Sequence, residues 1–141
     1  MNLFCDTSAL IKKYIIETGS DKFNKLLNKA DNVYVSAITE IESISTFKRL
    51  LIENAIDEND YDILINEFEI DYQYYSIIPL DDQIIKNAIK LIDKYQLKSL
   101  DSIQLGTVIY LKDEIDSFIA CDEKLIKAAL KEKIKIINPN K

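Results

Sequence analysis

Short runs of apolar residues alternate with longer amphipathic stretches along the chain, which leaves few folds open to it. The predicted strands are the apolar runs 3–5, 33–35, 74–78, 117–121 and 134–137. Strands that are separated by helices pair in parallel, because the chain has to cross over between them. Their apolar residues do not alternate strictly with polar ones, which is typical of a sheet covered on both faces. We therefore expect an α/β three-layer sandwich, in which about seven helices flank a short, mostly parallel five-stranded sheet.

The amphipathic stretches predict helices, and several begin beside a residue that can cap them. The predicted helices are 9–17 capped by Ser8, a short one from Ser20, 39–54, one from Asp57 to about 70, one from Asp81 to 95, one from Ser99 to about 111, and 123–130. Ile41 and Ile52 in the third, and Ile85, Ile89 and Ile92 in the fifth, are expected to face the core. No linker, repeat or low-complexity segment divides the sequence, so residues 1–141 are expected to form a single domain.

Residue types that are missing or rare exclude several classes of enzyme. There is no His, which excludes serine–histidine and cysteine–histidine nucleophiles and sites in which His binds zinc or iron. The two glycines, Gly19 and Gly106, cannot build a glycine-rich phosphate-binding loop. The two cysteines, Cys5 and Cys121, are too few for a four-thiolate zinc site and are expected to be reduced. Catalysis must therefore depend on carboxylates, Lys, Tyr, Ser, Thr or Cys.

The negative charge of the chain is concentrated in one stretch. A formal net charge of −6 by itself argues against binding to nucleic acid. Residues 53–82, however, contain ten acidic residues and no Lys or Arg, while the rest of the chain has 18 basic and 14 acidic residues. We expect the helix predicted in this acidic stretch to lie away from the functional site.

The sequence shows no sign of secretion or of a membrane anchor. Asp6 interrupts the N-terminus before an apolar leader can form, and no apolar run approaches the length of a membrane span. We therefore expect a cytoplasmic protein.

Two acidic residues come directly after predicted strands. Asp6 follows 3–5, and Asp122 follows 117–121. In an open parallel sheet, ligands bind beyond the carboxyl ends of the strands, so both side chains are candidates for a site. Each also precedes a predicted helix, where a carboxylate could instead cap the first turn.

Asp101 and Glu42 are two further candidate acids, each within a predicted amphipathic helix. Glu40 is the alternative to Glu42, because residues two positions apart on a helix point in different directions. Four carboxylates at one site would repel one another and raise one another's pKa unless a cation neutralised them. Oxygen ligands favour Mg²⁺ or Mn²⁺ over zinc, and such an ion can activate water for attack on a phosphodiester.

Four segments of the chain resemble the motifs of the PIN-domain nucleases. Asp6-Thr7-Ser8 after the first strand resembles their opening Asp-x-Ser motif. Residues 97–105, with Asp101, resemble the third motif, and residues 119–125, with Asp122, resemble the fourth.

The resemblance to the second motif favours Glu42 over Glu40. In the family, a Ser or Thr precedes the acidic residue by six positions and a basic residue follows it by seven. Ser36 and Arg49 stand at these distances from Glu42, which leaves Glu40 as the runner-up. The resemblance extends over nearly the whole chain and is greatest to the VapC-type toxins of toxin–antitoxin pairs.

The resemblance implies a Mg²⁺- or Mn²⁺-dependent endoribonuclease. Its catalytic acids would be Asp6, Glu42, Asp101 and Asp122, with Asp6, Asp101 and Asp122 as metal ligands and Ser8 orienting ligands or water. The resemblance also implies a homodimer that a small antitoxin protein inhibits. Gln104 stands where the family commonly has His, and we assign it no catalytic role.

Contacts to RNA phosphates are predicted for Arg49, Lys12 and Lys48. Arg49 is the strongest candidate, because it is the only Arg in a Lys-rich chain and guanidinium groups form specific forked contacts. The alternative to a nuclease is a catalytically inactive PIN-like module that binds RNA or a protein. The intact set of four carboxylates argues against that alternative.

Overall fold

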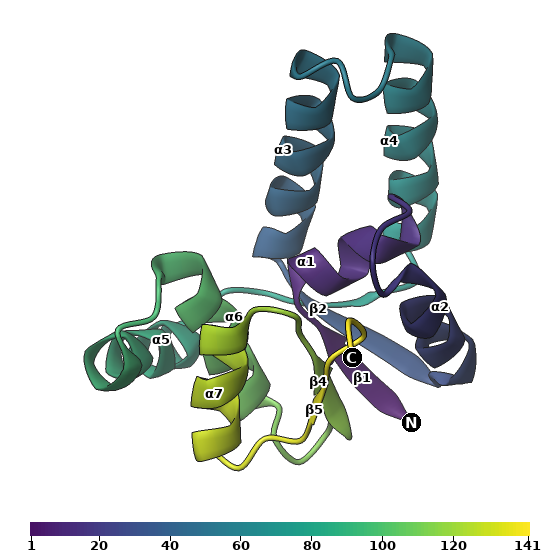
Figure 1. Ribbon diagram of the computed structural model, residues 1–141. Helices are drawn as coiled ribbons and strands as arrows, with labels where there is room; N and C mark the ends of the chain where they lie inside the picture. Colours follow the sequence, from purple (N-terminus) through teal and green to yellow (C-terminus); the bar gives the residue numbers. More distant parts are fainter.

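Five short strands form one sheet in the computed structural model, which describes residues 1–141 (Figure 1). The strands are β1 (Asn2–Cys5), β2 (Asn32–Ser36), β3 (Ser76–Ile78), β4 (Ser117–Ile119) and β5 (Ile136–Ile137). Their order in the sheet is β3-β2-β1-β4-β5, and every neighbouring pair is parallel. The carboxyl ends of all five strands therefore meet at one edge of the sheet. The predicted α/β fold with a parallel sheet is confirmed.

Helices cover both faces of this sheet. They are α1 (Thr7–Leu10), which continues as the 3₁₀ turn η1 (Ile11–Lys13), α2 (Ser20–Lys29), α3 (Ile38–Ile52), α4 (Glu58–Tyr72), α5 (Asp82–Tyr95), α6 (Ser99–Tyr110) and α7 (Glu123–Lys131). Each face has its own hydrophobic core, and β1 contributes to both because successive strand residues point to opposite sides. Leu3 and Cys5 pack with residues of α1–α4, whereas Phe4 packs with residues of α5–α7.

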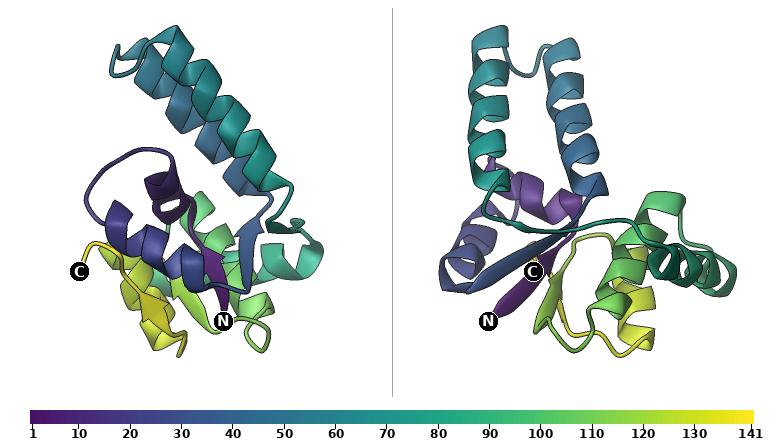
Figure 2. Two further views of the ribbon diagram at one scale, coloured as in Figure 1. Left: turned by 90° about the vertical axis from the view of Figure 1, so that its right-hand side faces the viewer. Right: turned by 180° about the vertical axis from the view of Figure 1, so that it is seen from behind.

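The acidic stretch forms α4, which pairs with α3 in a hairpin that projects away from the sheet (Figures 1 and 2). Asp57 caps α4 as predicted, because its side chain accepts a hydrogen bond from the Asp60 amide and the Asp60 side chain accepts one from the Asp57 amide. The rings of Phe47 and Phe68 hold the two helices together edge to face, with 5.9 Å between their centroids.

Several predicted boundaries are wrong, most clearly in the first helix. The helical segment ends at Lys13 rather than near 17, and Ser8 does not cap it. The segment starts two residues earlier than predicted, at Thr7, because the Asp6 carbonyl accepts the amides of Ala9 and Leu10. After η1 the chain folds back, with a positive φ of 88° at Gly19, where residues with a side chain are strained. The third, fourth and fifth strands are also shorter than predicted.

The predicted burial of five isoleucines is wrong as well. These side chains are exposed, and they are Ile41, Ile52, Ile85, Ile89 and Ile92. They lie beside the buried stripes of α3 and α5, in which Phe47 and Ile84 occupy the core positions. None of the helices is both long enough and apolar enough to cross a membrane.

Candidate active site

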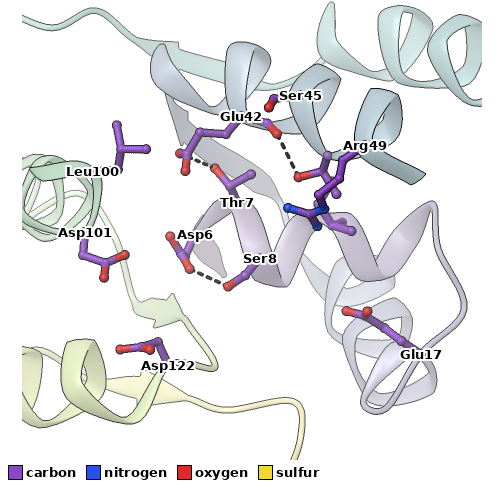
Figure 3. A pocket seen from close by; sticks show the side chains of 12 residues that line it. Asp6, Thr7, Ser8, Glu17, Glu42, Ser45, Arg49, Leu100, Asp101 and Asp122 are labelled. Carbon is purple, nitrogen blue, oxygen red and sulfur yellow. Dashed lines mark hydrogen bonds between the residues drawn. The ribbon is translucent and has the colours of Figure 1, made fainter. Parts of the chain in front are cut away.

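A pocket of about 510 Å³ opens at the carboxyl ends of β1 and β4, between α1, α3, α6 and α7 (Figure 3). Its lining is polar, and only two of its lining residues are hydrophobic. The lining residues are Asp6, Thr7, Ser8, Ile11, Glu17, Glu42, Ser45, Thr46, Arg49, Leu100, Asp101 and Asp122. All four predicted acids, Ser8 and Arg49 therefore lie together, although they come from four separate helical segments. No residue of α4 lines the pocket, as expected for the acidic helix.

Asp6 lies at the N-cap position of α1 but does not cap it with its side chain. Its amide donates to the carbonyl of Ile119, which extends the pairing of β1 with β4 by one residue. Its carboxylate instead accepts a hydrogen bond of 2.7 Å from the Ser8 hydroxyl. The Asp6 carboxylate therefore lies at the pocket and does not cap the first turn of α1 (Figure 3).

Asp122 both caps a helix and lines the pocket. Its Oδ1 accepts a hydrogen bond of 2.9 Å from the Leu125 amide, so the residue caps α7. The same side chain lines the pocket beside Asp101, which lies in the first turn of α6 (Figure 3). A capping carboxylate keeps one oxygen free, so the local role does not prevent a role in the pocket.

The electrostatics of the pocket are those of crowded acids. The pKa of Asp6 is raised to about 7, chiefly by burial and to a smaller extent by the negative charges of Asp101 and Glu42, while the Ser8 hydrogen bond acts to lower it. Burial also raises the pKa of Asp101, and the charge of Asp122 adds to the rise. Burial and mutual repulsion make the charged carboxylates unfavourable here, so the site is suited to binding a positively charged group that would offset their charge.

Glu42, rather than Glu40, is the glutamate of the pocket. Glu40 is exposed on the other side of α3 and does not line it. Glu42 is held from the interior, because the Thr7 hydroxyl donates to its Oε1 across 2.8 Å and the Gln104 amide lies 3.2 Å from the same oxygen. Thr7 and Gln104 were not recognised as partners of Glu42 from the sequence. A hydroxyl directly after Asp6 was the one available signal for Thr7.

The three predicted RNA contacts separate in the structure. Arg49 is exposed at the pocket, with its Nε 4.0 Å from Glu53. Lys48, one residue earlier on α3, does not line the pocket, and its ammonium group lies 5.2 Å from the centre of the Tyr61 ring. A phosphate contact therefore stays a proposal for Arg49, which lines the pocket, and not for Lys48, which does not.

The predicted contact between Lys12 and RNA is not supported, because the Lys12 side chain is only 5% exposed. Its ammonium group donates to the Glu17 carboxylate across 3.0 Å and to the Thr18 carbonyl across 2.6 Å. An amine bonded in this way is not available to a phosphate, so we do not propose an RNA contact for Lys12. It fixes the loop that brings Glu17, a pocket acid missed in the sequence, to the rim.

The carboxylates are compatible with a divalent cation that keeps part of its own water shell. No three acidic or thiol groups lie close enough together to enclose an ion. Mg²⁺, however, keeps several waters and is commonly held by one or two carboxylates, so a spread set of acids is compatible with it. The donors are all oxygens, which suits Mg²⁺ or Mn²⁺ and not zinc.

A family model of the PIN domain matches residues 3–131, which include every predicted site residue. The chain belongs to the PIN domain family. Solved structures share the fold of this PIN domain. They are FitAcB from Neisseria gonorrhoeae (16% identity, TM-score 0.77, 97% of both chains), a toxin–antitoxin complex from Klebsiella pneumoniae (19%, 0.71, 99% of this chain and 98% of that one) and VapBC2 from Rickettsia felis bound to a promoter DNA fragment (12%, 0.68, 98% of both).

A curated relative is similar to part of this PIN domain. It is a tyramine–L-glutamate ligase of Methanocaldococcus fervens, 36% identical over a match of 95 residues, which covers 61% of this chain. The match spans about a third of the length of that relative, 32%.

Proposed function

We propose that this PIN domain is a Mg²⁺- or Mn²⁺-dependent endoribonuclease and the toxin of a toxin–antitoxin pair. The observation that carries the proposal is the gathering of Asp6, Glu42, Asp101 and Asp122 around one polar pocket. Hydrolysis of a phosphodiester with a carboxylate-bound cation needs no His, which the chain lacks.

Each side chain has a separate part in the proposed site. Asp6, Asp101 and Asp122 would hold the cation, in part through waters that it keeps, because the three carboxylates are spread too widely to bind it together directly. When bound, the cation supplies positive charge against the phosphate and lowers the pKa of the attacking water. Ser8 keeps the Asp6 carboxylate in place, and Glu42 offers an oxygen toward the water.

The raised pKa of Asp6 favours this proposal over an inactive binding module. Burial next to Asp101 and Glu42 opposes the charged form of Asp6, and a cation would relieve that opposition. A module that never binds a cation would retain this unfavourable cluster with nothing to offset it.

An antitoxin partner, a homodimer and action in the cytoplasm belong to the same proposal. Support for the antitoxin comes from the shared fold with chains of toxin–antitoxin complexes. Light scattering on the purified protein tests the homodimer, which should have about twice the chain mass of 16.3 kDa.

An RNA cleavage assay tests the enzymatic proposal. The wild-type protein should cut RNA with Mg²⁺ or Mn²⁺ and stop when EDTA is added. Asp6→Asn and Asp101→Asn should lower the rate at least about 100-fold, while the exposed Asp93→Asn on α5 leaves it unchanged. Full activity in EDTA, or in both pocket variants, would falsify the proposal.

A further inference from the structure

We propose that Gln104 is a positioning residue, which fixes the Glu42 carboxylate so that one of its oxygens stays available to the pocket. The inference rests on the nuclease function proposed above and adds a residue that does not itself line the pocket. It stands on a set of hydrogen bonds that joins α1, α3 and α6 behind the site.

The amide of Gln104 lies at the centre of this set. The side chain is only 1% exposed, and its Nε2 lies 3.1 Å from Thr7 Oγ1, 3.3 Å from Thr39 Oγ1 and 3.2 Å from Glu42 Oε1. The Thr7 hydroxyl is 3.0 Å from that of Thr39 and donates to Glu42 Oε1. Every partner comes from an element that borders the pocket.

The direction of these hydrogen bonds follows from the charge of Glu42. An ionised carboxylate only accepts, so the nitrogen of the Gln104 amide has to face it and the oxygen has to face away. Thr7 donates its only proton to Glu42 and therefore accepts from Gln104 or Thr39. Two donors are thus directed at Oε1, while Oε2 has no hydrogen bond within the protein and belongs to a residue that lines the pocket.

The oxygen of the Gln104 amide indicates that this side chain does not serve to stabilise the fold. Gln104 Oε1 is buried and has no hydrogen-bond partner. A buried acceptor without a partner destabilises a fold, and an apolar side chain of the same length would avoid that cost. A polar side chain at this position is explained by the hydrogen bond that its nitrogen donates to Glu42.

The position of Gln104 on α6 connects two acids of the site. Gln104 follows Asp101 by three residues, so both lie on the same side of the helix. The amide therefore fixes the distance between α6, which carries Asp101, and Glu42 on α3. Because an amide does not titrate, the Gln104 donor is present at every pH.

Gln104→Met tests the inference, since it keeps the length of the side chain and removes the donor. Thr107→Val is the matched control: Thr107 is equally buried on α6, but its hydroxyl bonds only to the Ile103 carbonyl. With saturating Mn²⁺, Gln104→Met should lower kcat about 10- to 100-fold and leave KM for RNA unchanged. Thr107→Val should change neither, and Gln104→His, which restores an N–H donor, should recover most of kcat.

Two further measurements separate positioning from a general effect on folding. In the Glu42→Gln background, Gln104→Met should cause no further loss of kcat, because the residues act through one interaction. In the metal-free protein, Glu42→Gln should shift the side-chain amide NMR resonances of Gln104, one of only four glutamines. The second readout requires neither metal nor RNA.

The outcomes distinguish this inference from the proposed function. A wild-type protein that never cleaves RNA overturns the function, while the NMR shift still decides whether Gln104 holds Glu42. Wild-type cleavage together with an unchanged kcat in Gln104→Met, additive losses in the double variant, or unmoved Gln104 resonances would overturn the inference.

Discussion

The Ser8 hydroxyl donates a hydrogen bond of 2.7 Å to the Asp6 carboxylate, two residues before it in the chain. Burial raises the pKa of Asp6, and this hydrogen bond acts in the opposite direction. Ser8 thus keeps the charged form of Asp6 accessible in a pocket that otherwise opposes it.

Asp6→Asn should make the metal-free protein more stable, and the gain should depend on pH. The pKa of Asp6 is about 7 in the folded chain and near 3.8 without the fold, so the folded state binds more protons between these values. The contribution of Asp6 to the free energy of unfolding is therefore most favourable below pH 4, and it becomes less favourable as the pH rises to 7. In urea unfolding with EDTA present, the free energy of unfolding of Asp6→Asn should exceed that of the wild type by on the order of 4 kcal/mol at pH 8. The two free energies should be equal near pH 4.

A control on the surface makes this test specific. Asp93→Asn, on the exposed side of α5, should show no such gap at any pH. A gap between Asp6→Asn and the wild type that is the same at pH 4 and pH 8 would disprove the pKa shift as its source. Addition of Mn²⁺ should stabilise the wild type at pH 8 more than it stabilises Asp6→Asn.

Ser8→Ala should make the nuclease more sensitive to acid. Loss of the hydrogen bond raises the pKa of Asp6, so protons compete better with the cation for the carboxylate. The acidic limb of the pH–rate profile at limiting Mn²⁺ should move up by about one pH unit. Ser45→Ala, which removes another pocket serine without touching Asp6, should leave the profile in place, and an equal shift in both variants would count against the role of Ser8.

Arg49→Gln should weaken RNA binding, whereas Lys48→Gln should not. Arg49 lies at the pocket, while Lys48 on the same helix is occupied by the ring of Tyr61. Measured in EDTA to prevent cleavage, the affinity of Arg49→Gln should fall roughly 3- to 10-fold, with a salt slope smaller by about 1. Equal losses in the two variants would show that the charge of α3, and not the pocket, attracts RNA.

Lys12→Met should affect stability and not RNA binding. The substitution keeps the buried stem but removes the donor to Glu17 and to the Thr18 carbonyl. The free energy of unfolding should decrease by roughly 1–3 kcal/mol, as for other buried hydrogen bonds to charged groups. The same RNA titration should give the wild-type affinity, and a weaker affinity at unchanged stability would restore Lys12 as a phosphate contact.

Local features of the sequence predicted well what is local in the structure. Asp57 and Asp81 cap α4 and α5, and the strand ends place Asp6 and Asp122 at one edge of the sheet. Contacts between distant residues could not be predicted in this way. Lys12 carries the same charge as any surface lysine, and its burial depends on a loop that folds back over it.

Helical periodicity has the same limit. It identified an apolar stripe on α5, but it did not show that Ile84 faces the core while Ile85 and Ile89 face outward. Gln104 illustrates the point within the site, because its partners Thr7 and Glu42 are 97 and 62 residues away in the chain. The four carboxylates could be found because each lies in a short motif of neighbouring residues. The residues that hold them in place are distant in the sequence, so no short motif indicates them.

The central claim, that the carboxylate pocket binds a divalent cation, is tested most directly by calorimetric titration of Mn²⁺ into the RNA-free protein at pH 7. The wild type should bind Mn²⁺ saturably and release protons, because the pKa of Asp6 is about 7 and the cation displaces the proton that remains. Asp101→Asn should weaken this binding at least about 10-fold. A folded wild-type protein that takes up no Mn²⁺, or binds it equally well in Asp101→Asn, would contradict the account.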